Sequence, residues 1–326
     1  MQQDAKAILQ ASKFGILAAL AYSFNHPFSK AFLEQFPNTV HSISISIIIT
    51  EFIGLLIGLI LLTSLRYRRE ISNISKNSNF IVKMLFLSIL SSLGFVSYYL
   101  SLTQYNSVYV AAILNLYPLY IYILNILINK DNSDLKFEPI VLLLLIIASL
   151  GMIVSTIIFN NAGLYISTIG FILISITPIF YCLSTIYQYR FFKSHDTFAY
   201  VSLSIFFDAP LFISLGIATL YLTDFSFNFG NIEFEFIAIF IIGGQLSGIV
   251  ARFLTQSGQN IGLQYSKFMY VWLFLIPIFT GVIGTLLNLF KSVEGIGFNA
   301  ANLYQIILLT LVLFVFFFYN GKKTEN

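Results

Sequence analysis

The sequence is short of charge. Of its 326 residues only 10% are charged, whereas 58% are hydrophobic, and the mean hydropathy is +0.86. A soluble domain carries about 25% charged and about 45–50% apolar residues. With 17 basic and 14 acidic side chains, the chain cannot build the charged surface that a soluble globule of this length needs. The composition excludes a soluble enzyme, a secreted disulfide scaffold and a disordered chain, and predicts an all-α polytopic membrane protein.

Residues that carry chemistry are also scarce. The single cysteine, Cys182, cannot form an internal disulfide, and no Cys/His spacing typical of a metal site is present. The chain contains no HExxH motif and no P-loop. A net charge of +3 is too small to indicate nucleic-acid binding. We therefore expect no enzymatic activity, no cofactor, no bound metal and no nucleic-acid partner.

Long apolar runs dominate what is present. A membrane-spanning helix needs about 20 predominantly apolar residues, whereas a transmembrane β-strand has about 10 residues of alternating polarity. The run from Ile140 to Ile147 is apolar throughout and does not alternate, which favours helices. The pattern predicts ten transmembrane helices joined by short linkers, at residues 13–33, 41–64, 81–103, 107–129, 138–159, 164–190, 197–222, 234–256, 262–288 and 301–320.

Basic residues in the linkers predict the orientation of these helices, because positively charged loops stay in the cytoplasm. With the N-terminus inside, 13 Lys and Arg residues fall in cytoplasmic segments and only Lys30 and Lys291 fall on the opposite side. We expect a protein of the cytoplasmic (inner or plasma) membrane with both termini in the cytoplasm, and we expect Lys30 to extend to the outer headgroups. The 13 residues are Lys6, Lys13, Arg66, Arg68, Arg69, Lys76, Lys83, Lys130, Lys136, Arg190, Lys193, Lys322 and Lys323.

The two halves of the chain share a spacing. Five spans in each half would insert two homologous halves with opposite orientation, as an inverted repeat. Ten residues separate Ser107 from Pro118 in the fourth span and Ser266 from Pro277 in the ninth. Frequent proline in membrane helices is the alternative explanation. The pattern predicts two inverted five-helix repeats, with boundaries at 1–160 and 161–326.

The most specific pattern lies where the third span passes into the fourth. It is LTQYNS at residues 102–107, followed by Pro118; a similar stretch, GQNIGLQYS at residues 258–266, is followed by Pro277, and Gly151 stands in the fifth span. In these features the chain resembles EamA-type members of the drug/metabolite transporter superfamily. The resemblance implies ten helices in two inverted repeats and transport of a small metabolite by alternating access.

Polar and aromatic side chains within the spans are candidates for a substrate site, because polar groups are costly in lipid. The Asn115 amide can donate and accept, which suits a zwitterionic ligand; alternatively it bonds a carbonyl freed by Pro118. Aromatic side chains can form walls for organic ligands and hold cations, although 35 Phe and 19 Tyr make packing the alternative for each one. The candidate substrate-binding residues are Asn25, His26, Tyr98, Asn115, Tyr117, Tyr181, Gln245, Tyr270 and Trp272.

Three ionisable residues are candidates for proton coupling. His26 titrates near physiological pH; alternatively it is a neutral imidazole bonded to a neighbouring helix. Glu51 and Asp208 lie near the middle of the second and seventh spans, which correspond in the repeat. A charged carboxylate there costs roughly 2.5–3.5 kcal/mol, so each acid either exchanges a proton during transport or forms structural hydrogen bonds. Arg252 either reaches the inner headgroups or forms an anion trap at the inner mouth.

We predict a secondary transporter that moves a small organic metabolite across the cytoplasmic membrane. Without a nucleotide motif, a gradient or downhill exchange supplies the energy. The resemblance makes an amino acid or a related compound the leading substrate and export the favoured direction. A choline-like quaternary amine importer is one alternative, since aromatic walls with few fixed charges suit a cation. A non-transporting receptor or scaffold is another. The expected partners are the substrate, the lipid bilayer and, as a candidate coupling ion, the proton.

Overall fold

The computed structural model describes residues 2–76, 78–114, 116–128, 168–192, 197–223, 233–261, 268–269, 271–293 and 296–297, and single helical positions at 143, 146–147, 307, 310–311 and 314–315. Within these ranges every regular element is a helix. Six helices are long and apolar enough to cross a membrane, judged by length and composition, and two shorter helices are apolar. The prediction of an all-helical membrane protein is confirmed. Most of the fifth and tenth predicted spans lies outside the described residues.

The first helices follow the predicted spans, with two differences. Helix α1 already begins at Gln2, because Gln, Ala, Lys and Leu in its first turns favour helix. A short helix, α3, occupies the predicted linker after residue 64; it buries Ile74 and exposes Arg68 and Arg69. The elements are α1 (Gln2–Leu33), α2 (Thr39–Leu61), α3 (Leu65–Ser75) and α4 (Phe80–Gln104).

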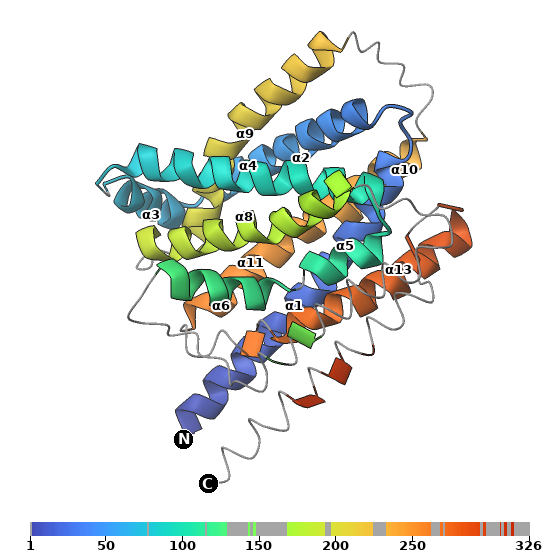
Figure 1. Cartoon of the computed structure of the whole chain (residues 1–326). Coiled ribbons are helices and arrows are strands. Elements are labelled where there is room, and N and C mark those ends of the chain that lie inside the picture. Colours follow the sequence, from blue (N-terminus) through green and yellow to red (C-terminus); the bar gives the residue numbers. More distant parts are fainter. Residues whose placement is uncertain are drawn as a thin grey trace.

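The fourth predicted span is not one continuous helix. It divides into α5 (Ser107–Leu114) and α6 (Tyr117–Ile128). Pro118 has no N–H with which to continue the ladder, and tight turns form instead, such as that from Leu116 N–H to the Ile113 carbonyl at 3.1 Å. The most extensive contacts of the two helices differ, because α5 packs mainly on α13 (Ile276–Phe290) and α6 packs mainly on α8 (Thr168–Phe192), as Figure 1 shows.

The eighth predicted span is helical throughout but changes its winding in the middle. A wider π-helical turn, η3 (Phe240–Leu246), lies between α10 (Phe234–Ile239) and α11 (Ser247–Asn260). Such turns within α-helices occur frequently at functional sites. This one carries Gln245, a buried polar residue. The seventh span is α9, Thr197–Leu222.

Three helix pairs make the most extensive contacts, namely α2 with α9, α4 with α8, and α1 with α11 (Figure 1). Where α1 meets α2, Lys30 bonds to the α4 terminus and His41 bonds to Thr223 beyond α9. We call this the Pro37 end of the bundle. At the opposite end, which we call the α3 end, Ile74 packs with Phe192 and other apolar residues from α4 and α9. The long helices therefore run between two defined ends.

A proline inside α1 is accommodated by its neighbour. Pro27 cannot donate to the Ser23 carbonyl four residues earlier. That carbonyl instead accepts from Thr280 Oγ1 of α13 at 3.5 Å, and Ser23 Oγ donates to the Ile276 carbonyl at 3.1 Å. The backbone group that Pro27 frees therefore ties α1 to α13.

Candidate functional site

A cavity of about 310 Å³ lies between α1, α2, α4, α8, α9 and α11. The α8 residues that line it come from the half of this helix nearer the α3 end, and the lining residues of α11 lie on the α3 side of the π-helical turn, so the cavity extends from mid-bundle toward that end. The lining is rich in polar side chains, which are Tyr22, Asn25, His26, Thr50, Glu51, Ser91, Tyr98, Tyr117, Tyr181, Ser184, Thr185, Gln188, Asp208, Gln245, Arg252, Thr255 and Gln256.

The structure brings six of the nine candidate substrate-binding residues together in this wall, and these are Asn25, His26, Tyr98, Tyr117, Tyr181 and Gln245. Trp272 is not part of it; its Cβ lies 3.0 Å from where a Gly15 Cβ would stand, so it packs against α1 instead. Asn115 and Tyr270 lie outside the described residues. The wall also includes Gln188, which the sequence does not single out as a ligand contact.

A hydrogen-bonded chain connects α1, α4 and the π-helical turn. The Tyr98 hydroxyl donates to Asn25 Oδ1 at 2.7 Å and lies 2.9 Å from His26 Nδ1. Because its one proton is used, this hydroxyl accepts from His26, whose Nδ1 therefore carries a proton. Asn25 Nδ2 in turn donates to the Gly244 carbonyl at 2.7 Å. Among the interpretations of His26, this geometry supports an imidazole bonded to a neighbouring helix.

Two further tyrosines join helices beside the cavity. The Tyr99 hydroxyl accepts from Gln245 Nε2 at 3.0 Å and lies 3.3 Å from Thr50 Oγ1. The Tyr117 hydroxyl donates to Thr185 Oγ1, which ties α6 to α8. The polar wall is therefore held by side-chain contacts between helices.

The cavity contains two acids and one guanidinium. Glu51 comes from α2, Asp208 from α9 and Arg252 from α11, and Arg252 lies within electrostatic range of both acids. Arg252 Nη2 donates to Ser204 Oγ at 3.0 Å. Arg252 therefore stands among the residues that line the cavity. Asp208 is only 5% exposed, and its Oδ1 has no hydrogen-bond partner among the described residues.

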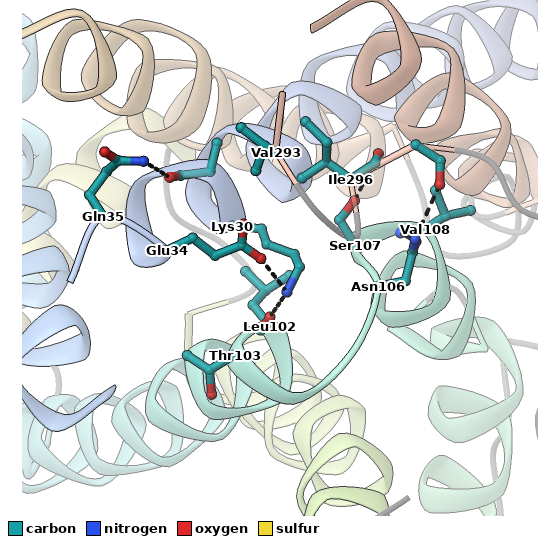
Figure 2. A network of polar contacts seen from close by, with 12 residues as sticks. Lys30, Glu34, Gln35, Leu102, Thr103, Asn106, Ser107, Val108, Val293 and Ile296 are labelled. Carbon is teal, nitrogen blue, oxygen red and sulfur yellow. Dashed lines mark hydrogen bonds and ion pairs between the residues drawn. The ribbon is translucent and has the colours of Figure 1, made fainter. Parts of the chain in front are cut away.

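Polar contacts close the Pro37 end of the bundle, as Figure 2 shows. Lys30 Nζ donates to the Leu102 carbonyl at 2.9 Å and lies 3.1 Å from a Glu34 carboxylate oxygen. We call these three groups the Lys30 cluster. The expectation that Lys30 extends to the headgroups is wrong: the side chain is 8% exposed, because the carbonyl at the end of α4 binds the ammonium within the protein.

Next to the Lys30 cluster, the chain after α13 is tied to the start of α5. Asn106 Nδ2 donates to the Gly297 carbonyl at 3.1 Å and Ser107 Oγ donates to the Ile296 carbonyl at 3.2 Å (Figure 2). At the same end Lys291 forms ion pairs with Glu233, which precedes α10, and with Glu235, which lies in the first turn of α10. The Glu233 carboxylate, followed by that of Glu235, raises the pKa of the Lys291 ammonium above its ordinary value.

Helices of membrane-spanning length around a polar, partly charged cavity are features of a multi-pass membrane protein. Residues 10–157 match the model of the EamA-like transporter family, so this part of the chain is an EamA-like domain of the drug/metabolite transporter superfamily. The fold extends further: one solved structure, described as a crystal structure of a protein, is similar over 93% of this chain and 94% of its own, with a TM-score of 0.58 and 14% sequence identity. The comparison with curated proteins gave no match.

Proposed function

We propose that the protein is a secondary transporter that moves a small organic metabolite across the cytoplasmic membrane by alternating access, with export as the favoured direction. One observation carries the proposal: a cavity of about 310 Å³ with three charged side chains lies between helices of an EamA-like chain. Charged groups inside a membrane are costly and are typical of substrate pathways. The volume lies at the lower end of the range for small-molecule sites, which suits a metabolite.

An amino acid or a related compound fits the chemistry of the cavity. Arg252 offers a guanidinium suited to a carboxylate. Glu51 and Asp208 can accept hydrogen bonds from an ammonium group, and Tyr181 and Phe95 offer aromatic surface. A choline-like quaternary amine is the alternative. The same aromatic surface supports it, but such a ligand offers no carboxylate to Arg252.

We propose the two inverted five-helix repeats, 1–160 and 161–326, on related contacts in the two halves. Ser23 Oγ of α1 donates to the Ile276 carbonyl just before Pro277, and Cys182 Sγ of α8 lies 3.5 Å from the Tyr117 carbonyl just before Pro118. Both the donors and the acceptors lie 159 positions apart in the sequence, as do the two prolines. The helix pairings support the same repeat, since the packing of α4 on α8 corresponds to the packing of α1 on α11.

The two ends of the bundle support an inward-facing state. The distribution of basic residues supports a cytoplasmic location for the α3 end, and the cavity extends toward that end. The Lys30 cluster and the bonds from Ser107 and Asn106 close the opposite end. Alternating access requires that these contacts break when the cavity opens outward.

Proton coupling is proposed at Glu51 of α2 and Asp208 of α9, which line the same cavity and lie within electrostatic range of each other. The charged and titratable groups nearest to them are Arg252 and the hydroxyl of Tyr99. His26 is the remaining candidate, although its bond to Tyr98 gives it a structural role already.

Counterflow into proteoliposomes tests the transport proposal. Vesicles that contain the purified protein and an unlabelled amino-acid mixture should accumulate labelled L-lysine, L-leucine or L-glutamate transiently. The variant Ile249→Trp should abolish flux because this side chain lines the cavity, whereas Val250→Trp, on the exposed side of the same helix, should retain it. Absence of counterflow for every probe, with a monodisperse wild-type protein, would refute the proposal.

A further inference from the structure

The cavity lining contains more acidic than basic side chains. Among the described lining residues, Glu51 and Asp208 supply two carboxylates and Arg252 supplies the one guanidinium. No lysine lines the cavity in the part of the chain that the structure describes. His26 is held by Tyr98 as a hydrogen-bonded imidazole. With these groups in their ordinary charge states, the cavity has one negative charge more than it has positive charges.

Arg252 lies within electrostatic range of both carboxylates, but neither carboxylate forms a direct ion pair within the described structure. Buried Asp208 has an oxygen without a hydrogen-bond partner there, and a buried polar atom in that state is costly. Glu51 and Asp208 lie within electrostatic range of each other, so their charges repel. A cationic group placed between them would relieve both costs.

The remaining lining residues suit the same ligand. Arg252 is anchored by Ser204, and a planar guanidinium binds a carboxylate with two parallel hydrogen bonds. Tyr22, Phe95 and Tyr181 bring aromatic rings to the wall, and such rings attract cations. A ligand that satisfies every charged group would carry one carboxylate and two cationic groups.

We infer that the cavity selects amino acids with a cationic side chain over neutral or acidic ones. This inference rests on the proposed transport function and specifies its substrate class. The ligand carboxylate binds Arg252, and the two cationic groups of the ligand pair with Glu51 and Asp208 beside the aromatic wall.

Equilibrium binding to the purified full-length chain tests the inference, with labelled L-lysine competed by L-leucine, L-glutamate or cadaverine. L-lysine should bind at least about tenfold more tightly than L-leucine, because leucine lacks the second cation. L-glutamate should bind most weakly. Cadaverine, which has two ammonium groups and no carboxylate, should bind more weakly than lysine because it leaves Arg252 unmatched.

Substitutions test which lining side chain binds each charged group of the ligand. Glu51→Gln and Asp208→Asn keep the shape of each side chain, and each should bring the affinity ratio of lysine to leucine closer to one. Arg252→Gln should reverse the preference of lysine over cadaverine. Glu70→Gln, which removes a carboxylate on α3 outside the cavity, should leave all affinities unchanged. Two acid variants are included so that a fold defect in one does not prevent the test.

Equal affinity for leucine and lysine in the wild-type protein would overturn the inference, and so would a ratio that neither acid variant changes. Absence of lysine binding would overturn it as well. Its failure is distinguishable from failure of the transport proposal. Counterflow of leucine without lysine binding would leave the transporter in place and refute only the selectivity. Absence of counterflow for every probe would refute transport itself.

Discussion

At the scale of single residues, the same side-chain type has different roles at different depths. Lys30 is buried and binds the carbonyl at the end of α4, whereas Lys291 stands partly exposed between two glutamates. His26 and Tyr98 form part of a hydrogen-bonded chain that ends on a backbone carbonyl. Polar residues near the cavity therefore stabilise the wall as well as line it.

Removal of one buried hydroxyl should measure that stabilisation. Tyr99→Phe deletes the acceptor for Gln245 and leaves a buried amide without it. We expect a loss of about 1 kcal/mol in the free energy of unfolding, because interhelical hydrogen bonds in membrane proteins are worth about that much. The measurement is unfolding in mixed micelles. Tyr221→Phe, at a side chain that is 83% exposed, is the control and should change nothing; equal effects of both variants would refute the assignment.

The two acids should determine how transport depends on pH. If Glu51 and Asp208 exchange protons, Glu51→Gln and Asp208→Asn should each flatten the dependence of flux on an imposed pH gradient, since the amides do not titrate. Proteoliposome flux between pH 5.5 and 8.5 measures this. Wild-type flux with an unchanged pH profile in both variants would exclude these acids as the coupling site and leave them a structural role.

At the scale of helices, breaks in regular winding lie beside the cavity. Pro118 divides the fourth span, and its two parts, α5 and α6, pack on different neighbours. The π-helical turn η3 carries Gln245 to Tyr99 and presents the Gly244 carbonyl to Asn25. Both irregularities free or redirect backbone groups, which membrane helices tolerate only where protein or a cavity satisfies them.

A close approach at the Pro37 end should be sensitive to one methyl group. An added Cβ at Gly284 would lie 1.6 Å from the Ile296 carbonyl oxygen, so Gly284→Ala must displace the segment that bonds to Ser107. We expect a loss of about 2 kcal/mol or more in stability, as for overpacking in a core. Thermal unfolding in detergent measures it. Gly54→Ala, whose new Cβ would meet only the movable side chain of Ile205, should be tolerated better; the reverse order would contradict the packing.

At the scale of the whole molecule, closure is asymmetric. At the Pro37 end a hydrogen bond joins α1 to α4 and two others join the start of α5 to the chain after α13, while the cavity extends toward the α3 end. A carrier in this arrangement has to exchange one set of closing contacts for another during each cycle.

Loss of the Lys30 cluster should favour the outward-open state. Lys30→Met removes the donor to Leu102 and the partner of Glu34. A thiol at Ser101, which is buried on α4 between Tyr98 of the cavity wall and the Pro37 end, should then react about tenfold faster with an impermeant reagent from outside, as a shift of about 1.4 kcal/mol predicts. Lys83→Met, at the α3 end, is the control. An unchanged labelling rate would separate this cluster from gating.

Both termini should lie in the cytoplasm, as the distribution of Lys and Arg indicates. In a Cys182→Ser background, a thiol at Pro37 should react with an impermeant reagent in intact cells, and a thiol at Asn77 should react only after lysis. Reaction at Asn77 in intact cells would reverse the orientation and, with it, the assignment of the closed end as the outer one.

The sequence by itself determined the membrane character and the position of most helices, because hydropathy and helix length are local properties. It also indicated six substrate-binding candidates of the cavity wall together with Glu51, Asp208 and Arg252, since a polar side chain inside an apolar run needs an internal partner wherever the helix packs. Tertiary structure alone decided which of these groups meet. It joined Glu51 and Asp208 with Arg252 in one cavity, packed Trp272 against Gly15 and buried Lys30 beneath the end of α4. These outcomes depend on the rotation and pairing of helices distant in sequence, which periodicity along one helix does not specify.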